Sequence, residues 1–237
     1  MANINDEIVI KKNVVGGIEW PHMITENTFD KKTSIEIDKA FEDWENNRHI
    51  SKKPSERWAN NIVSYTSIMF FPDCSRWKDC VSELWKENKY SPEYNKNSKD
   101  YLVVLELSIL KDNREYPFHV DVQRKQMTGV CYWGKGQDGT IIKSGNQMAE
   151  IAFKHNRCLW FSNTSEEMWR EDVEKKENKI MPWHRYRNTS NKPRYTVNIN
   201  YTPQPSINSF LDKKNSQLIY WLENKKPLWT PLQFKGK

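Results

Sequence analysis

Apolar residues recur at helical spacing in the first third of the chain and at alternating positions after about residue 100. In the first third, the pattern predicts an amphipathic helix over 33–47, with Thr33 or Ser34 as its N-cap. The apolar face of this helix would comprise Ile35, Ile37, Ala40, Phe41 and Trp44. A further helix is predicted from about 73 to 88, after a β-rich stretch over 64–71.

From residue 101 onward, short runs of alternating polar and apolar residues predict a series of strands separated by turns. The predicted strands are 101–110, 116–123, 127–133, 148–153, 157–162 and 194–201, with another opening at Thr140. Many short strands after a helical part predict a mainly β fold with a helical buttress, of the β-sandwich or jelly-roll class. We expect one domain over 1–237, with a helical part over 1–99 and a jelly-roll core over 100–203.

Two of the predicted strands carry polar side chains on one face and apolar side chains on the other. On the strand 116–123, His119, Asp121 and Gln123 would share the polar face, and the apolar face is expected to pack into the sandwich. The polar face of the strand 194–201 comprises Arg194, Thr196, Asn198 and Asn200. Polar groups inside a barrel cost free energy unless they bind something. The pattern therefore predicts a polar site within the sheets.

His119 and Asp121 are two residues apart on a strand, so their side chains can hold one metal ion. One imidazole and one carboxylate do not complete the coordination of a first-row metal, so a third protein ligand is needed. The other histidines are His22, His49, His155 and His184. We interpret His22 and His49 as surface residues. His155 is a rival third ligand, although its turn context favours a solvated histidine.

Composition and charge limit the kinds of partner and the cellular compartment that we expect for this protein. The net charge of +6 and the pI of about 9.0 are compatible with an anionic substrate or nucleic acid, but the basic residues form no long block. The four cysteines include no CxxC pair and are expected to be reduced thiols. We find neither a signal-peptide pattern nor the roughly 20 apolar residues that span a bilayer, and we expect a cytoplasmic protein.

With these residues in order, the chain resembles the Fe(II)- and 2-oxoglutarate-dependent dioxygenases. Members of that family have His-x-Asp on one strand, a distant histidine, and a basic residue about one strand further on. The matching residues here are His119, Asp121, His184 and Arg194, and the resemblance covers about residues 100–203. It implies a double-stranded β-helix, another name for the jelly roll.

The resemblance also implies a chemistry. His119, Asp121 and His184 would form a facial triad for Fe(II) and leave open positions for 2-oxoglutarate and dioxygen. The protein would then couple oxidative decarboxylation of 2-oxoglutarate to hydroxylation of a substrate. Prolyl-hydroxylase-like enzymes of similar size suggest a peptidyl proline or a free amino acid as that substrate.

Three residues are implied in binding 2-oxoglutarate. Arg194 would pair with the carboxylate far from the iron, since a guanidinium can bind a carboxylate through two hydrogen bonds. Thr196, on the same face of the strand, would add a hydroxyl contact. Tyr132 is a further candidate, provided that its side chain points inward.

Three other functions remain compatible with the sequence. A cupin-like jelly roll that binds a metal or a sugar without oxygenase activity would keep His119 and Asp121, but it has no need of Arg194. A structural or interaction sandwich would expose both polar faces to solvent. A nucleic-acid oxygenase would fit the charge, although such proteins usually show a clearer basic and aromatic groove.

Overall fold

The computed structural model describes residues 7–12, 15–47, 64–71, 81–84, 86, 101–110, 113–121, 126–163, 171, 180–203 and 230–231. The elements are β1 (Val9–Lys12), β2 (His22–Glu26), α1 (Lys31–Asn47), β3 (Ser64–Phe71), β4 (Tyr101–Leu110), β5 (Arg114–His119), β6 (Met127–Trp133), β7 (Thr140–Ser144), β8 (Gln147–Ile151), β9 (Cys158–Ser162), β10 (Trp183–Asn188), β11 (Arg194–Pro203) and β12 (Thr230–Pro231). Within these ranges, no helix is both long and apolar enough to cross a bilayer.

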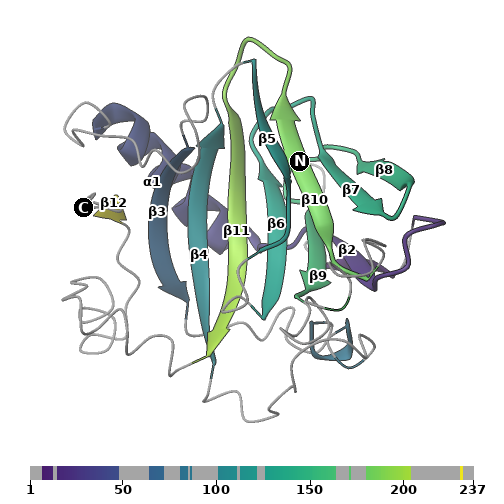
Figure 1. Cartoon of the computed structure of the whole chain (residues 1–237). Helices are drawn as coiled ribbons and strands as arrows, with labels where there is room; N and C mark the ends of the chain where they lie inside the picture. The colour runs from purple at the N-terminus through teal and green to yellow at the C-terminus, as the bar shows by residue number, and fades with distance from the viewer. Residues whose placement is uncertain are drawn as a thin grey trace.

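The strands form two sheets (Figure 1). The large sheet has the order β1-β2-β9-β6-β11-β4-β3-β12, and the small sheet has the order β5-β10-β7-β8. The small sheet lies over one side of the large sheet, and α1 lies behind the large sheet on its other side (Figure 1).

The consecutive strands β4 to β11 pair in a nested order. β4 pairs with β11, β5 with β10, β6 with β9 and β7 with β8, and every pair is antiparallel. Pairing of the first strand with the last, and so on inward, is the topology of a jelly roll. The predicted jelly roll is therefore confirmed.

The large sheet separates two cores. On the α1 side, Ile37 and Phe41 of the helix pack into a cluster with alternate residues of β4, β6, β9 and β11. On the side of the small sheet, a second cluster includes Val130, Tyr132 and Phe161. On β11, Val197 and Ile199 belong to the α1 side, so the alternation places Arg194, Thr196, Asn198 and Asn200 toward the small sheet.

Helix α1 begins earlier than predicted. The carboxylate of Asp30 accepts a hydrogen bond from the backbone N–H of Thr33 at 2.7 Å, so Asp30 is the N-cap and the prediction of Thr33 or Ser34 is wrong. Ile37 is buried, whereas Ile35 is 59% exposed. Each residue turns an α-helix by about 100°, which places Ile35 nearly opposite Ile37.

Strand β5 differs from its prediction in both extent and orientation. It ends at His119, so Asp121 lies just beyond the strand. Phe118 was expected to pack into the sandwich, and this is wrong because its ring lies under the guanidinium of Arg185, 4.7 Å from the ring centroid. Arg185 alternates along β10 with His184, which points inward, so Phe118 belongs to the outer face of the small sheet. A cation over an aromatic ring is favourable even at a wet surface.

The N-terminal segment extends the large sheet through β2, which pairs with β9. The prediction of a surface His22 is wrong, because this side chain is fully buried. Its Nδ1 lies 3.2 Å from the carbonyl of Trp20, and its Nε2 accepts from the N–H of Val15 at 3.2 Å. Burial lowers the pKa of His22, which favours the neutral ring that these two contacts require.

Candidate metal centre

The first two candidate ligands come from the end of β5. The Nδ1 atom of His119 lies 3.0 Å from the carbonyl oxygen of Pro117. Because a carbonyl can only accept, Nδ1 carries the proton and the lone pair is on Nε2. That Nε2 lies 3.9 Å from Oδ1 of Asp121. The backbone thus selects the histidine tautomer that can bind a metal through Nε2.

The third candidate ligand, His184, lies opposite His119 on the neighbouring strand β10. Its Nδ1 lies 2.9 Å from the carbonyl of Pro182, which repeats the arrangement at His119. The two imidazole centroids are 4.3 Å apart. His184 is buried, whereas the side chain of His119 is partly exposed. Each histidine therefore follows a proline by two residues, and each uses that proline's carbonyl to hold its ring.

An irregularity in the pairing of β5 and β10 brings further rings to the site. His184 is opposite His119 and Tyr186 is opposite Tyr116, so β5 has one more residue than β10 in this interval. Such a bulge lets Tyr116 and His119 face the same side although they are three residues apart. Tyr116 stacks on Tyr186 with centroids 4.9 Å apart. The bulge contains Pro117, which has no N–H to leave unpaired.

Asp121 is oriented from the large sheet. Its Oδ2 accepts a hydrogen bond of 2.7 Å from the hydroxyl of Thr128, which stands on the inner face of β6. One ligand atom from each of His119, Asp121 and His184 can be chosen so that the three lie within 4.8 Å of one another. Two imidazoles and one carboxylate with this spacing are a donor set suited to non-haem Fe(II).

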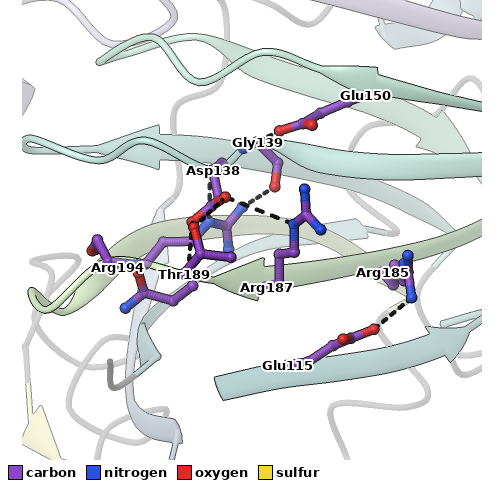
Figure 2. Close-up of polar contacts among 10 residues, drawn as sticks. Glu115, Asp138, Gly139, Glu150, Arg185, Arg187, Thr189 and Arg194 are labelled. Atoms are coloured by element: carbon purple, nitrogen blue, oxygen red, sulfur yellow. Dashed lines mark hydrogen bonds and ion pairs between the residues drawn. The ribbon is translucent and has the colours of Figure 1, made fainter. Parts of the chain in front are cut away.

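Arg194 is deeply buried at 2% exposure and lies between two aromatic rings. Its guanidinium carbon is 5.5 Å from the ring centroid of Tyr132 and 5.0 Å from that of Tyr186. Its Nε donates to the carbonyl of Asp138 at 3.0 Å, and Nη2 lies 3.3 Å from the carbonyl of Gly139 (Figure 2).

The remaining nitrogen of Arg194, Nη1, has no hydrogen-bond partner among the residues that the structure describes. Burial lowers the pKa of the Arg194 guanidinium from its ordinary value. Nη2 also lies 3.4 Å from the hydroxyl of Thr140. A buried cation whose hydrogen bonds go to carbonyls and a hydroxyl lacks a contacting negative charge, and this is costly. A carboxylate that reached Nη1 would supply both the charge and the acceptor.

The turn after β6 positions Arg194. The carboxylate of Asp138 accepts from the backbone N–H of Thr189 at 2.7 Å and from its hydroxyl at 2.9 Å, which fixes the turn to the connection between β10 and β11 (Figure 2). At Gly139 an added Cβ would lie 1.7 Å from the carbonyl oxygen of Ile151, so only glycine fits there. These contacts hold the two carbonyls that face Arg194.

Tyr132 and Thr196, the other two predicted contacts of the co-substrate, are both buried on the inner face and lie opposite each other on β6 and β11. The hydroxyl of Tyr132 donates to the carbonyl of Ile151 at 3.1 Å and accepts from the N–H of Thr140 at 3.0 Å. Burial raises the pKa of Tyr132 to about 12. Tyr132 therefore offers a neutral ring beside Arg194, with its hydroxyl engaged by the backbone.

The roles of several residues in the site could not be predicted from the sequence pattern. Strand β10 was not predicted, so the inward direction of Tyr186 and the opposition of His184 to His119 could not be foreseen. Alternation along β6 does place Thr128 on the inner face. Its hydrogen bond to Asp121, however, depends on the path of the chain after β5. His155, considered as a rival ligand, lies in its turn, where its Nδ1 accepts from the N–H of Gly134 and its ring packs against Trp133.

No family model matches the chain, and no curated protein matches it. Among solved structures, it is similar to a prolyl-4-hydroxylase from Pseudomonas putida, with 7% identity over 77% of this chain and 92% of that chain and a TM-score of 0.46. A viral collagen prolyl hydroxylase from Paramecium Bursaria Chlorella virus-1 matches with 12% identity, 77% and 96% coverage and a TM-score of 0.43.

An oxidoreductase of the 2OG-Fe(II) oxygenase family from Burkholderia pseudomallei matches with 10% identity and a TM-score of 0.37, over 54% of this chain and 51% of that chain. The chain thus spans about half the length of that protein. It resembles oxygenases of this family. Because these identities and TM-scores are low, a functional assignment rests on the geometry of the site itself.

Proposed function

We propose that the protein is a 2-oxoglutarate-dependent Fe(II) oxygenase, in which His119, Asp121 and His184 hold the iron. Arg194 would bind the carboxylate of 2-oxoglutarate that is far from the iron. The first substrates to consider are a free amino acid and a peptidyl proline. The observation that carries the proposal is the pairing of a three-ligand cluster with a buried arginine on the same inner surface.

The donor set fits the iron. Both histidines present Nε2, because each Nδ1 is bound to a proline carbonyl. Thr128 occupies Oδ2 of Asp121 and leaves Oδ1 on the side of His119. Three protein ligands leave open coordination positions for a chelating co-substrate. A closed structural site would require a fourth protein ligand.

Arg194 fits the co-substrate. Its Nη1 is buried without a hydrogen-bond partner within the described ranges, and a carboxylate is the acceptor that a guanidinium binds most strongly. Tyr186 belongs to the same strand and face as His184 and lies between the metal ligands and Arg194. A dicarboxylate that joins the metal to Arg194 would therefore lie along Tyr186.

Bound iron and 2-oxoglutarate would supply the oxidising chemistry, and the chain would supply binding, orientation and shielding. The Pro117 and Pro182 carbonyls hold the two imidazole rings, and Thr128 holds the carboxylate. Tyr116 stacks on Tyr186 and packs against the ring of His119. Arg194 sets the direction in which the co-substrate lies.

The decisive test is anaerobic reconstitution with Fe(II) and 2-oxoglutarate. We expect a weak visible metal-to-ligand charge-transfer band in the wild-type protein and none in His119→Ala, which should also lose iron stoichiometry. His155→Ala, a histidine of the exposed turn, is the matched control and should keep both. Folded, iron-loaded wild-type protein without the band would exclude the proposal and favour a metal-binding jelly roll without oxygenase activity.

A further inference from the structure

A row of polar side chains on the inner face of β4 and β11 has no role in holding iron or 2-oxoglutarate as proposed above. Its members are Glu106, Ser108, Asn198 and Asn200. The amide of Asn200 donates to Oε2 of Glu106 at 3.4 Å, and the amide of Asn198 donates to the hydroxyl of Ser108 at 3.3 Å. These bonds leave Oδ1 of Asn200 without a partner among the described residues, and such a buried polar atom costs free energy unless a ligand reaches it.

The row lies beside the candidate metal ligands. Asn200 is opposite Thr128 on the neighbouring strand, and Thr128 donates its hydroxyl to Asp121. Asn200 in turn donates to Glu106 on β4. Glu106 and Asn200 therefore border the space next to the metal ligands, away from Arg194 at the start of β11.

The row offers acceptors. Asn200 is 3% exposed, and its Oδ1 is buried without a hydrogen-bond partner in the part of the chain that the structure describes. Its amide contact with Glu106 is at the long limit of a hydrogen bond, so a stronger donor can replace it. A carboxylate beside an unpaired amide oxygen favours a ligand that carries several N–H donors and a positive charge.

The charges of the proposed site lead to the same ligand. Glu106 is the carboxylate of this row, and the Arg194 cation lies at the start of β11, away from it. An anionic substrate would be repelled there, whereas a cation would be attracted.

We propose that the substrate presents an ammonium or guanidinium group to Glu106 and Asn200, next to the metal. This rests on the proposed oxygenase function and specifies its substrate class. A free amino acid or a lysine or arginine side chain carries such a group, whereas a prolyl ring within a peptide carries neither the charge nor an N–H. Glu106 is thus a specificity-determining residue.

Small-molecule probes test the proposed cation preference without knowledge of the full substrate. In these samples Mn(II) replaces iron and 2-oxoglutarate is saturating. Mn(II) is paramagnetic, so the enhancement of the probe's proton relaxation measures how closely each probe approaches the metal. The cationic probes are n-butylammonium and methylguanidinium, and their neutral counterparts are n-butanol and N-methylurea. In the wild-type protein we expect at least a fivefold larger relaxation enhancement for each cation than for its neutral counterpart.

Glu106→Gln keeps the size of the side chain and removes its charge, and it should bring the cations down to the level of the neutral probes. Glu115→Gln is the matched control, because Glu115 pairs with Arg185 on the outer face, and it should leave the preference intact. Asn200→Asp adds a carboxylate and should increase the preference, which provides a second test if Glu106→Gln does not fold.

The outcomes separate the two proposals. Equal enhancement by cations and neutral probes, or a preference that survives Glu106→Gln, overturns the cationic substrate. Titration of 2-oxoglutarate into the same Mn(II) samples tests the oxygenase site independently. If wild-type protein binds 2-oxoglutarate but shows no cation preference, only the substrate class fails. If it binds none, both proposals fail.

Discussion

Two charged clusters of the protein use similar residue types in opposite ways. Glu26 at the end of β2 forms ion pairs with Lys154 and with Arg157, the latter at 2.8 Å. Its hydrogen bond from Lys154 is the main reason that the pKa of Glu26 is lowered to about 2. In this cluster the carboxylate and both cations pair with one another, although Nε of Arg157 is also buried without a hydrogen-bond partner among the described residues.

Arg194 is more deeply buried than this cluster, yet its guanidinium contacts carbonyls and a hydroxyl instead of a carboxylate. The nearby carboxylate of Asp138 is bonded to Thr189, and it forms an ion pair with Arg187 at 3.7 Å. A charge that is paired with an opposite charge contributes to stability, whereas a buried charge whose hydrogen bonds go to carbonyls and a hydroxyl is suited to binding a ligand. Substitutions should therefore affect stability in one cluster and ligand affinity in the other.

The largest effect is expected for Arg194→Met. Loss of the cation should weaken 2-oxoglutarate binding about 100-fold, because removing one partner of a buried charge pair costs about 2–5 kcal/mol. Calorimetric titration with Mn(II) present measures this affinity. The free energy of unfolding without ligand should change by no more than about 1 kcal/mol, because the lost hydrogen bonds are offset by removal of a buried charge.

Metal affinity is the control for Arg194→Met and should remain at the wild-type value. Equal loss of metal and 2-oxoglutarate binding would mean that Arg194 has a structural role, and the contrast with the Glu26 cluster would then disappear.

Asp138→Asn should have an intermediate effect, because Asp138 supplies a carbonyl that Arg194 bonds, and its charge also favours the Arg194 cation. Weaker bonds to Thr189 should let that carbonyl move, and we expect about a tenfold rise in KM for 2-oxoglutarate. The value of kcat should stay within about twofold, because the metal ligands are unaffected. Steady-state succinate production measures both constants. A fall in kcat at unchanged KM would contradict a positioning role.

The smallest effect is expected for Glu26→Gln, which should lower the free energy of unfolding by about 1 kcal/mol at pH 7, since Lys154 is well exposed and solvent screens the pair. The pKa of Glu26 is about 2 in the folded protein, below its ordinary value of 4.5. Its stabilisation is therefore complete above about pH 4.5 and is lost as the pH falls toward 2.

Urea denaturation at several pH values tests the Glu26 prediction. The wild-type protein and Glu26→Gln should differ at pH 7 and converge near pH 2. Lys11→Gln, which removes a longer and exposed contact with Glu26, should change stability less. Any loss of 2-oxoglutarate affinity in Glu26→Gln would break the division between a structural cluster and a binding cluster.

Much of this organisation follows from local patterns. Alternation along 194–201 was sufficient to assign Arg194 and Thr196 to one face and Val197 and Ile199 to the other, because side chains in a strand point to opposite faces in turn. On β5 the rule separates Phe118 from His119, but the bulge at Pro117 breaks the alternation before them, so that Tyr116 shares the face of His119. A bulge depends on the partner strand, and β10 was not foreseen.

The sequence by itself determined the order of His119, Asp121, His184 and Arg194 and the class of fold that joins them. It did so because period-two alternation and turn residues act over a few neighbouring positions. Only the tertiary structure decided that Arg194 is buried with Nη1 unpaired among the described residues, and that Asn200 lies opposite Thr128, which bonds Asp121. These contacts join residues far apart in the chain, and they form only when the nested strands bring two sheets together.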